Sequence, residues 1–109
     1  MRTDWVLENE MIRITYNLQD NAGSDTDVPG GDTLQIVLQR YNDGSQDIYV
    51  YLTAPQVTRT SLGNYQLEVP TGSGVLVSGT NQNQFAYEWQ VDGSVTDRER
   101  GEFVVVADL

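Results

Sequence analysis

The chain has 109 residues and a formal charge of −10, which results from 16 acidic and 6 basic residues. All six basic residues are arginine, and the sequence contains no lysine, histidine or cysteine. Catalytic systems that need a histidine, cysteine or lysine are therefore excluded, and so are zinc sites of the usual Cys/His type. The negative charge disfavours nucleic acids and anionic membranes as partners, because both need cations to neutralise them.

The length fits one domain that spans residues 1–109. The N-terminus has no apolar stretch of signal-peptide length, and no segment has the composition of a membrane span. We therefore expect the protein to be made and used without Sec export.

Apolar residues alternate with polar ones in most segments, which is typical of half-buried β-strands. Residues 12–16 predict a first strand, and residues 34–41 predict the next. Between them, residues 17–32 are rich in Asp, Asn, Gly and Ser and predict a long acidic loop.

A hairpin turn is predicted at residues 42–44, because Asp-Gly favours the positive backbone angles of a tight turn. The returning segment 48–52 has aliphatic residues at even positions and tyrosines at odd ones. We expect the core to receive the aliphatic set, which is Ile48, Val50 and Leu52. Tyr49 and Tyr51 are then expected on the outer face.

The sequence from Ala54 to Gly63 is irregular, and alternation resumes over residues 65–69. Residues 75–78 are a short apolar run, and residues 85–91 form the clearest alternating segment. The closing segment runs from Val95 through a charged turn to Val106. These patterns predict an all-β, immunoglobulin-like antiparallel sandwich of about seven strands.

Three segments share an order of motifs with a known group of domains: 63–70, 85–93 and 101–105. They read as a G-x-Y-x-hydrophobic strand, a Y-x-hydrophobic-x-V strand closed by Asp-Gly, and a G-x-F-x-V strand. The G-D-T start at residues 31–33 adds to them. This pattern resembles the immunoglobulin-like domains of bacteriophage baseplate upper proteins and related virion modules.

The resemblance implies a non-enzymatic structural protein of a phage virion, at a tail, baseplate or capsid-decoration position. It implies synthesis in the host cytoplasm and a final location in the virion. The implied partners are other virion proteins or copies of the chain itself, arranged in a symmetric assembly.

Candidate interface residues are aromatic residues that are expected to be exposed, a terminal anchor and arginines. They are Trp5, Tyr41, Tyr49, Tyr51, Arg98, Arg100 and Phe103. Residues 1–10 could form an N-terminal arm that packs on this domain or reaches a neighbour. The apolar run 103–106 could be an edge strand that accepts a partner strand, or an interior strand.

An alternative function uses the same tyrosines. Tyr41, Tyr49 and Tyr51 could form a platform that stacks on sugar rings, which would make the chain a carbohydrate- or receptor-binding module, with or without Ca²⁺.

Four aspartates in the acidic loop are the only metal candidates that the sequence suggests: Asp20, Asp25, Asp27 and Asp32. EF-hand spacing fails, because the fifth position counted from Asp25 is Pro29 and the twelfth is Ile36. The other reading is a solvated loop, so no cofactor is expected, with Ca²⁺ as the exception to test.

Glu68 and Glu88 could in principle form a pair of carboxylates for glycoside hydrolysis. Glutamate on the outer face of a strand more often serves solubility, and nothing in the sequence singles out an acid with a raised pKa. We therefore expect no enzymatic activity.

Overall fold

The computed structural model describes residues 3–7, 11–41, 44–70 and 84–106. These residues form eight strands and no helix. None of the described segments is therefore a helix of the length and apolarity that crossing a bilayer requires. The strands are β1 (Thr3–Leu7), β2 (Met11–Asn17), β3 (Thr33–Arg40), β4 (Gln46–Val50), β5 (Val57–Ser61), β6 (Asn64–Pro70), β7 (Gln84–Asp92) and β8 (Asp97–Val106).

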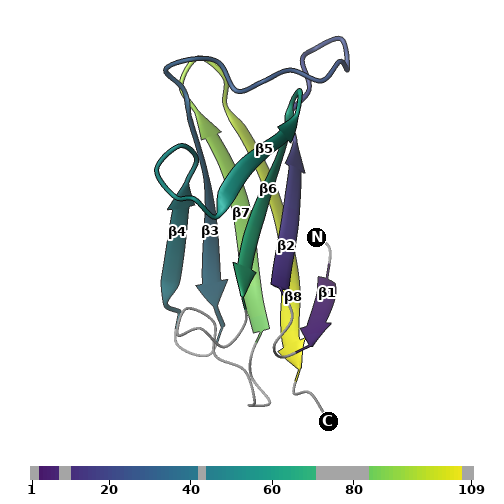
Figure 1. The fold of residues 1–109 in the computed structure, drawn as a ribbon, viewed down its shortest axis with the longest axis vertical. Helices are drawn as coiled ribbons and strands as arrows, with labels where there is room; N and C mark the ends of the chain where they lie inside the picture. Colours follow the sequence, from purple (N-terminus) through teal and green to yellow (C-terminus); the bar gives the residue numbers. More distant parts are fainter. Residues whose placement is uncertain (1–2, 8–10, 42–43, 71–83, 107–109) are drawn as a thin grey trace.

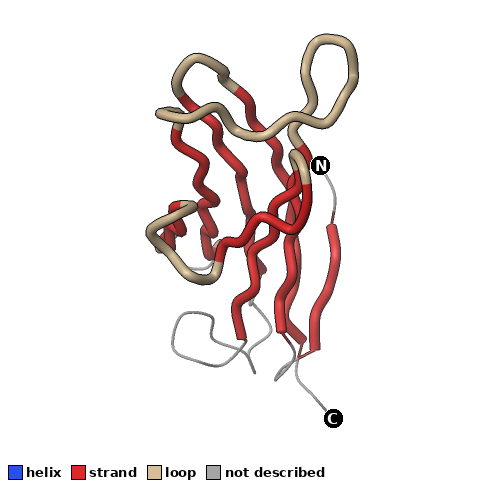
Figure 2. The backbone as a smooth tube through the Cα atoms, turned by 45° about the horizontal axis from the view of Figure 1, so that its top comes forward, coloured by secondary structure: helices blue, strands red, loops and turns tan. Residues whose placement is uncertain are grey.

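The strands build two sheets that pack face to face (Figure 1). The larger sheet has the order β1-β8-β7-β3-β4, and the smaller has the order β2-β6-β5. Every pairing is antiparallel except that of β1 with β8, which is parallel. The loop between β2 and β3 crosses one end of the sandwich from the small sheet to the large one (Figure 2). The predicted two-sheet β architecture is confirmed.

Strict alternation places one face of each long strand in the core. In β2 and β7 every second residue is buried and its neighbours are more exposed. Rows from both sheets interdigitate, as expected for a sandwich. The buried residues include Ile12, Leu34, Ile36, Leu38, Leu67, Val69, Phe85, Val91 and Val105.

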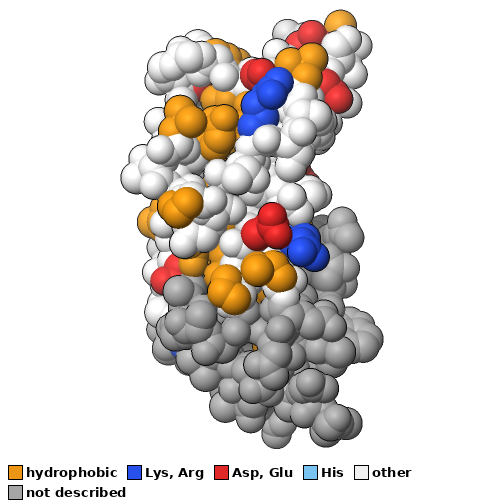
Figure 3. Space-filling view, viewed as in Figure 1, with side chains coloured by type: hydrophobic (Ala, Val, Ile, Leu, Met, Phe, Trp, Pro, Cys, Tyr) orange, Lys and Arg blue, Asp and Glu red, His pale blue; other side chains and the backbone are white. Residues whose placement is uncertain are grey.

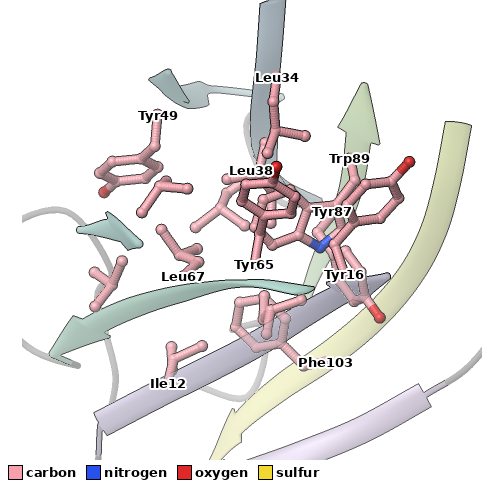
Figure 4. Packing of buried hydrophobic residues seen from close by; sticks show 14 of the residues in the cluster. Ile12, Tyr16, Leu34, Leu38, Tyr49, Tyr65, Leu67, Tyr87, Trp89 and Phe103 are labelled. Atoms are coloured by element: carbon pink, nitrogen blue, oxygen red, sulfur yellow. The ribbon is translucent and has the colours of Figure 1, made fainter. Parts of the chain in front are cut away.

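Aromatic residues occupy the centre of this core (Figure 4). Tyr16 of β2 stacks on Trp89 of β7 with ring centroids 5.5 Å apart, and this contact joins the two sheets. The hydroxyl of Tyr16 donates a hydrogen bond to Asp97 of β8. Burial and this neighbouring carboxylate raise the pKa of Tyr16 far above its ordinary value, so the phenol stays protonated.

The expected orientation of the segment 48–52 is wrong. Tyr49 is only 8% exposed, whereas Ile48 is 53% and Leu52 is 87% exposed. Tyr49 lies beside the fully buried Ile36 in the pairing of β3 with β4, so it belongs to the inward row. Two apolar sets alternate in this segment, and a period of two cannot say which set faces inward. Burying the larger aromatic rings removes more apolar surface from water.

Three further segments differ from expectation. β5 lies in the irregular stretch between Ala54 and Gly63. It shows no alternation, because only Val57 of its five residues is buried and its pairing with β6 is bulged. The charged turn expected at residues 98–100 is part of β8. The edge-strand reading of residues 103–106 is wrong, because β8 lies between β1 and β7.

Residues 3–7, within the candidate arm 1–10, form β1 along β8. The apolar run predicted at 75–78 and the Asn42-Asp43 part of the first hairpin turn lie outside the described residues.

We expect Trp89→Ala to lower the free energy of unfolding by about 3–5 kcal/mol, because it removes the largest side chain of the core and its stacking contact. Urea denaturation followed by circular dichroism measures this loss. Thr15→Ala, at an exposed position of β2, is the control and should change the value by less than about 0.5 kcal/mol. A loss below about 1 kcal/mol for Trp89→Ala would contradict the central role of the stack.

Candidate functional site

The outer face of the large sheet consists of ordered rows of side chains that cross four strands. The strand pairings define one row as Ile48, Val37, Glu88 and Arg100, from β4 to β8. The rows on either side are Val50-Gln35-Gln90-Arg98 and Gln46-Gln39-Ala86-Glu102. Aliphatic side chains therefore gather over β4 and β3, amides lie in the middle, and charges lie over β7 and β8.

The amides and charges of this face form a connected network. Gln35 Nε2 donates to Gln90 Oε1 at 2.8 Å, and Gln90 Nε2 donates to Glu88 Oε1 at 2.7 Å. Arg100 also bonds Glu88, and Arg98 Nε lies 3.8 Å from it. The Gln90 hydrogen bond, followed by the Arg100 contact, holds the pKa of Glu88 below its usual value. The network keeps Glu88 ionised and orders the polar half of the face.

A shallow cavity of about 270 Å³ lies on this face over β3, β7 and β8. Its lining consists of Val37, Gln39, Ala86, Tyr87, Glu88, Gln90, Arg100 and Gly101. A Cβ atom on Gly101 would overlap the phenol ring of Tyr87, so the glycine leaves room for this ring over β8. The cavity combines an apolar floor with amide and guanidinium donors, which suits a protruding side chain of a partner.

The opposite face of the sandwich has a different composition (Figure 3). Hydrophobic side chains show in several places on it, and its charges occur as separated pairs: Arg13 Nε with Glu68 Oε2 at 3.1 Å, and Arg59 Nε with Asp27 Oδ1 at 2.9 Å. Glu68 lies on this face and Glu88 on the other. The two carboxylates are thus separated by the whole core and cannot act together on one glycosidic bond.

The residues predicted for an interface separate into two groups. Tyr41 is 52% exposed and donates a hydrogen bond to Glu102, and the two arginines belong to the rows described above. Tyr49 and Phe103 are buried in the core. Tyr51 packs edge-on against Tyr65, with ring centroids 5.1 Å apart. For Trp5, the structure gives its place in β1, beside Val104 of β8.

The expected tyrosine platform is therefore wrong, because two of its three rings face the core. Sequence reasoning also missed the outward aliphatic residues Val37, Ile48 and Val50. For Ile48 and Val50, the sequence signal was the two interleaved apolar sets of segment 48–52, which leave one set outside whichever way the strand turns.

The four loop aspartates are directed to different partners. Asp20 accepts hydrogen bonds from the backbone N–H groups of Ala22 and Ser24, and Asp25 accepts from the Asn17 and Gln19 amides. Within the described part of the chain, no three acidic side chains converge as a metal site would require.

The other two aspartates tie the loop to neighbouring turns. Asp27 accepts from Arg59 and from the backbone N–H of Gly63 at 2.8 Å. Asp32 accepts from the backbone N–H groups of Ser94 at 2.9 Å and Val95 at 3.0 Å. These hydrogen bonds lower the pKa of both aspartates. The acidic residues of this loop therefore act as structural acceptors.

Neither a protein-family model nor a curated protein matches the chain. Solved structures do match it. The ZIG-8 IG1 homodimer aligns with a TM-score of 0.54 and 13% identity, over 97% of this chain and 79% of that chain. The ZIG-8–RIG-5 IG1–IG1 heterodimer aligns with a TM-score of 0.55 and 12% identity, over 95% and 81%.

A third match is the extracellular domain of the voltage-gated sodium channel beta4 subunit, whose parallel homodimers are described as explaining its role in cell-cell adhesion. Its TM-score is 0.55 at 13% identity, over 98% of this chain and 92% of that chain. At these identities the matches establish the fold alone, and the predicted immunoglobulin-like sandwich is confirmed.

The predicted role as a phage virion protein is contradicted. The matched structures are immunoglobulin domains that form homodimers or heterodimers, one of them described for cell-cell adhesion. The motifs that suggested a baseplate module are turn glycines and alternating strands, which any sandwich of this type needs.

We expect stability to decrease as the pH falls below about 4, because Asp25, Asp27 and Asp32 have pKa values below their ordinary 3.8. A carboxylate whose pKa is lowered by folding stabilises the folded state at pH values above its unfolded-state pKa. That stabilisation is lost as the pH falls through its folded-state pKa. Asp32→Asn should melt at a lower temperature at neutral pH and lose less on acidification. Thermal melts between about pH 7 and pH 2 measure both effects. Identical profiles for variant and parent would contradict the role of Asp32.

Proposed function

We propose that this chain is a non-enzymatic protein-binding module that recognises another immunoglobulin-like domain through the outer face of its large sheet. A second copy of the chain is the simplest such partner. The observation that carries the proposal is the aliphatic group Val37, Ile48 and Val50, which lies outward beside an ordered amide network.

The composition of the face supports this function. Apolar residues at the centre of an interface exclude water, and polar groups around them provide specific hydrogen bonds. Gln35 and Gln90 are already held by hydrogen bonds, so ordering them on binding costs little entropy. The face displays no lysine, whose flexible side chain is depleted at interfaces.

The electrostatics of the face also support a protein partner. Glu88 is neutralised by Arg98 and Arg100, and Asp92 lies 2.8 Å from Arg98. Two copies of a chain with a charge of −10 repel each other least where their charges are locally balanced. The matched structures add a parallel case, because they are homodimers and a heterodimer of immunoglobulin domains.

We expect the purified chain to form a dimer whose population rises with concentration, as measured by sedimentation velocity. Ile48→Asp should raise the dimer dissociation constant at least about tenfold, because it places a charge in the apolar part of the face. Thr15→Asp adds the same charge at an exposed position of the opposite sheet and should leave dimerisation unchanged. A wild-type chain that stays monomeric up to about 1 mM would contradict self-recognition.

A further inference from the structure

Leu52 stands in an unusual position for a leucine. It lies in the turn after β4, two residues past the strand's end at Val50, its side chain is 87% exposed, and its backbone φ is +74°. It is the one residue other than glycine with a positive φ in the described part of the chain. A bulky side chain in this conformation is a true outlier, and such outliers cluster at sites with a function.

The surrounding backbone holds Leu52 in this conformation. Tyr51 N–H donates to Leu34 O at 2.9 Å, and the N–H groups of Thr53 and Ala54 both donate to Val50 O, at 3.1 and 2.7 Å. The ring of Tyr51 is fixed against Tyr65. The turn therefore presents the leucine on a rigid support, which reduces the entropy lost on binding.

Leu52 forms part of the wall of an open groove. The groove has a volume of about 430 Å³ and is lined by residues 51–55 and 57–59, at the corner where the chain passes from β4 to β5. Apolar side chains gather along this side of the molecule (Figure 3). One corner of the chain thus carries both a projecting apolar side chain and a groove that could receive one.

The corner is also close to electrically neutral. Arg59 is the single charged residue in the groove lining, and Asp27 balances it at 2.9 Å. The chain as a whole carries −10, so this corner is a place where two copies can approach with little repulsion. A two-fold contact requires a surface that is complementary to itself, and a leucine beside a groove meets this requirement.

We propose that Leu52 is an anchor in the contact between two copies of this chain, where it enters the groove at residues 51–59 of its partner copy. The inference rests on the proposed function, because Leu52 lies in the turn that directly follows the edge strand carrying Ile48 and Val50. It extends the binding surface from the outer face of the large sheet around its β4 edge.

Leu52→Asn tests the proposal without endangering the fold, because asparagine tolerates a positive φ and the leucine has almost no contacts to lose. We expect a dimer dissociation constant raised at least about tenfold. At a protein concentration low enough for the wild-type chain to be monomeric, we expect an unchanged or higher melting temperature. Leu62→Asn is the matched control, since Leu62 is 54% exposed and has an ordinary φ. It should leave dimerisation unchanged.

The outcomes separate the two proposals. If Ile48→Asp weakens the dimer and Leu52→Asn does not, the anchor is overturned and the proposed function stands. If the wild-type chain does not dimerise, self-recognition and the anchor fail together. If Leu52→Asn markedly lowers the melting temperature of the monomeric chain at low concentration, the leucine has a structural role and the anchor is also overturned.

Cross-linking gives a second readout, because the chain contains no cysteine. A mixture of Leu52→Cys and Thr58→Cys chains should form a mixed disulfide under mild oxidation, since Thr58 lines the groove. A mixture of Leu62→Cys and Thr58→Cys chains should form it much more slowly. Equal rates for the two mixtures would overturn the proposed contact.

Discussion

The contact between Tyr16 and Trp89 connects the two sheets at the centre of the core. β2 pairs with β6 in the small sheet, and β7 lies between β3 and β8 in the large one. β2 and β7 thus occupy the positions of the two strands that a disulfide joins in antibody domains. This chain has no cysteine, so a stacked pair of aromatic rings makes the corresponding link through packing alone. The hydrogen bond from Tyr16 to Asp97 adds a connection to β8.

Once this link sets the inward row of β7, the strand pairings set the outward rows of the large sheet. Trp89 pairs with Ile36, and Ile36 pairs with Tyr49, so all three lie in one inward row. Val37 and Ile48 are then necessarily outward. The aliphatic surface that we propose for binding is thus a consequence of placing aromatic rings in the core, because each strand has only two faces.

The acidic residues have a role that their number in the sequence does not suggest. Asp27 and Asp32 fix the long loop to the β5–β6 and β7–β8 turns through backbone N–H groups. Those N–H groups lie in turns and not in strand pairings. Each still needs an acceptor, and the carboxylates of the loop accept these hydrogen bonds. The carboxylates of the loop therefore hold it in place through these hydrogen bonds. On the large sheet, arginines from β8 balance the acidic side chains.

Sequence alone was sufficient for the all-β class, for most of the strands and for the loop at residues 17–32, because alternation and turn residues are local properties. It could not orient residues 48–52, where both alternating sets are apolar, nor find β5, where one residue of five is buried. The pairing of strands and the joining of Glu88, Gln90 and Arg100 in one network required the three-dimensional arrangement. Contacts between β7 and β8 or between β3 and β4 depend on the register of the strand pairing. The register is fixed by which rows of side chains pack in the core.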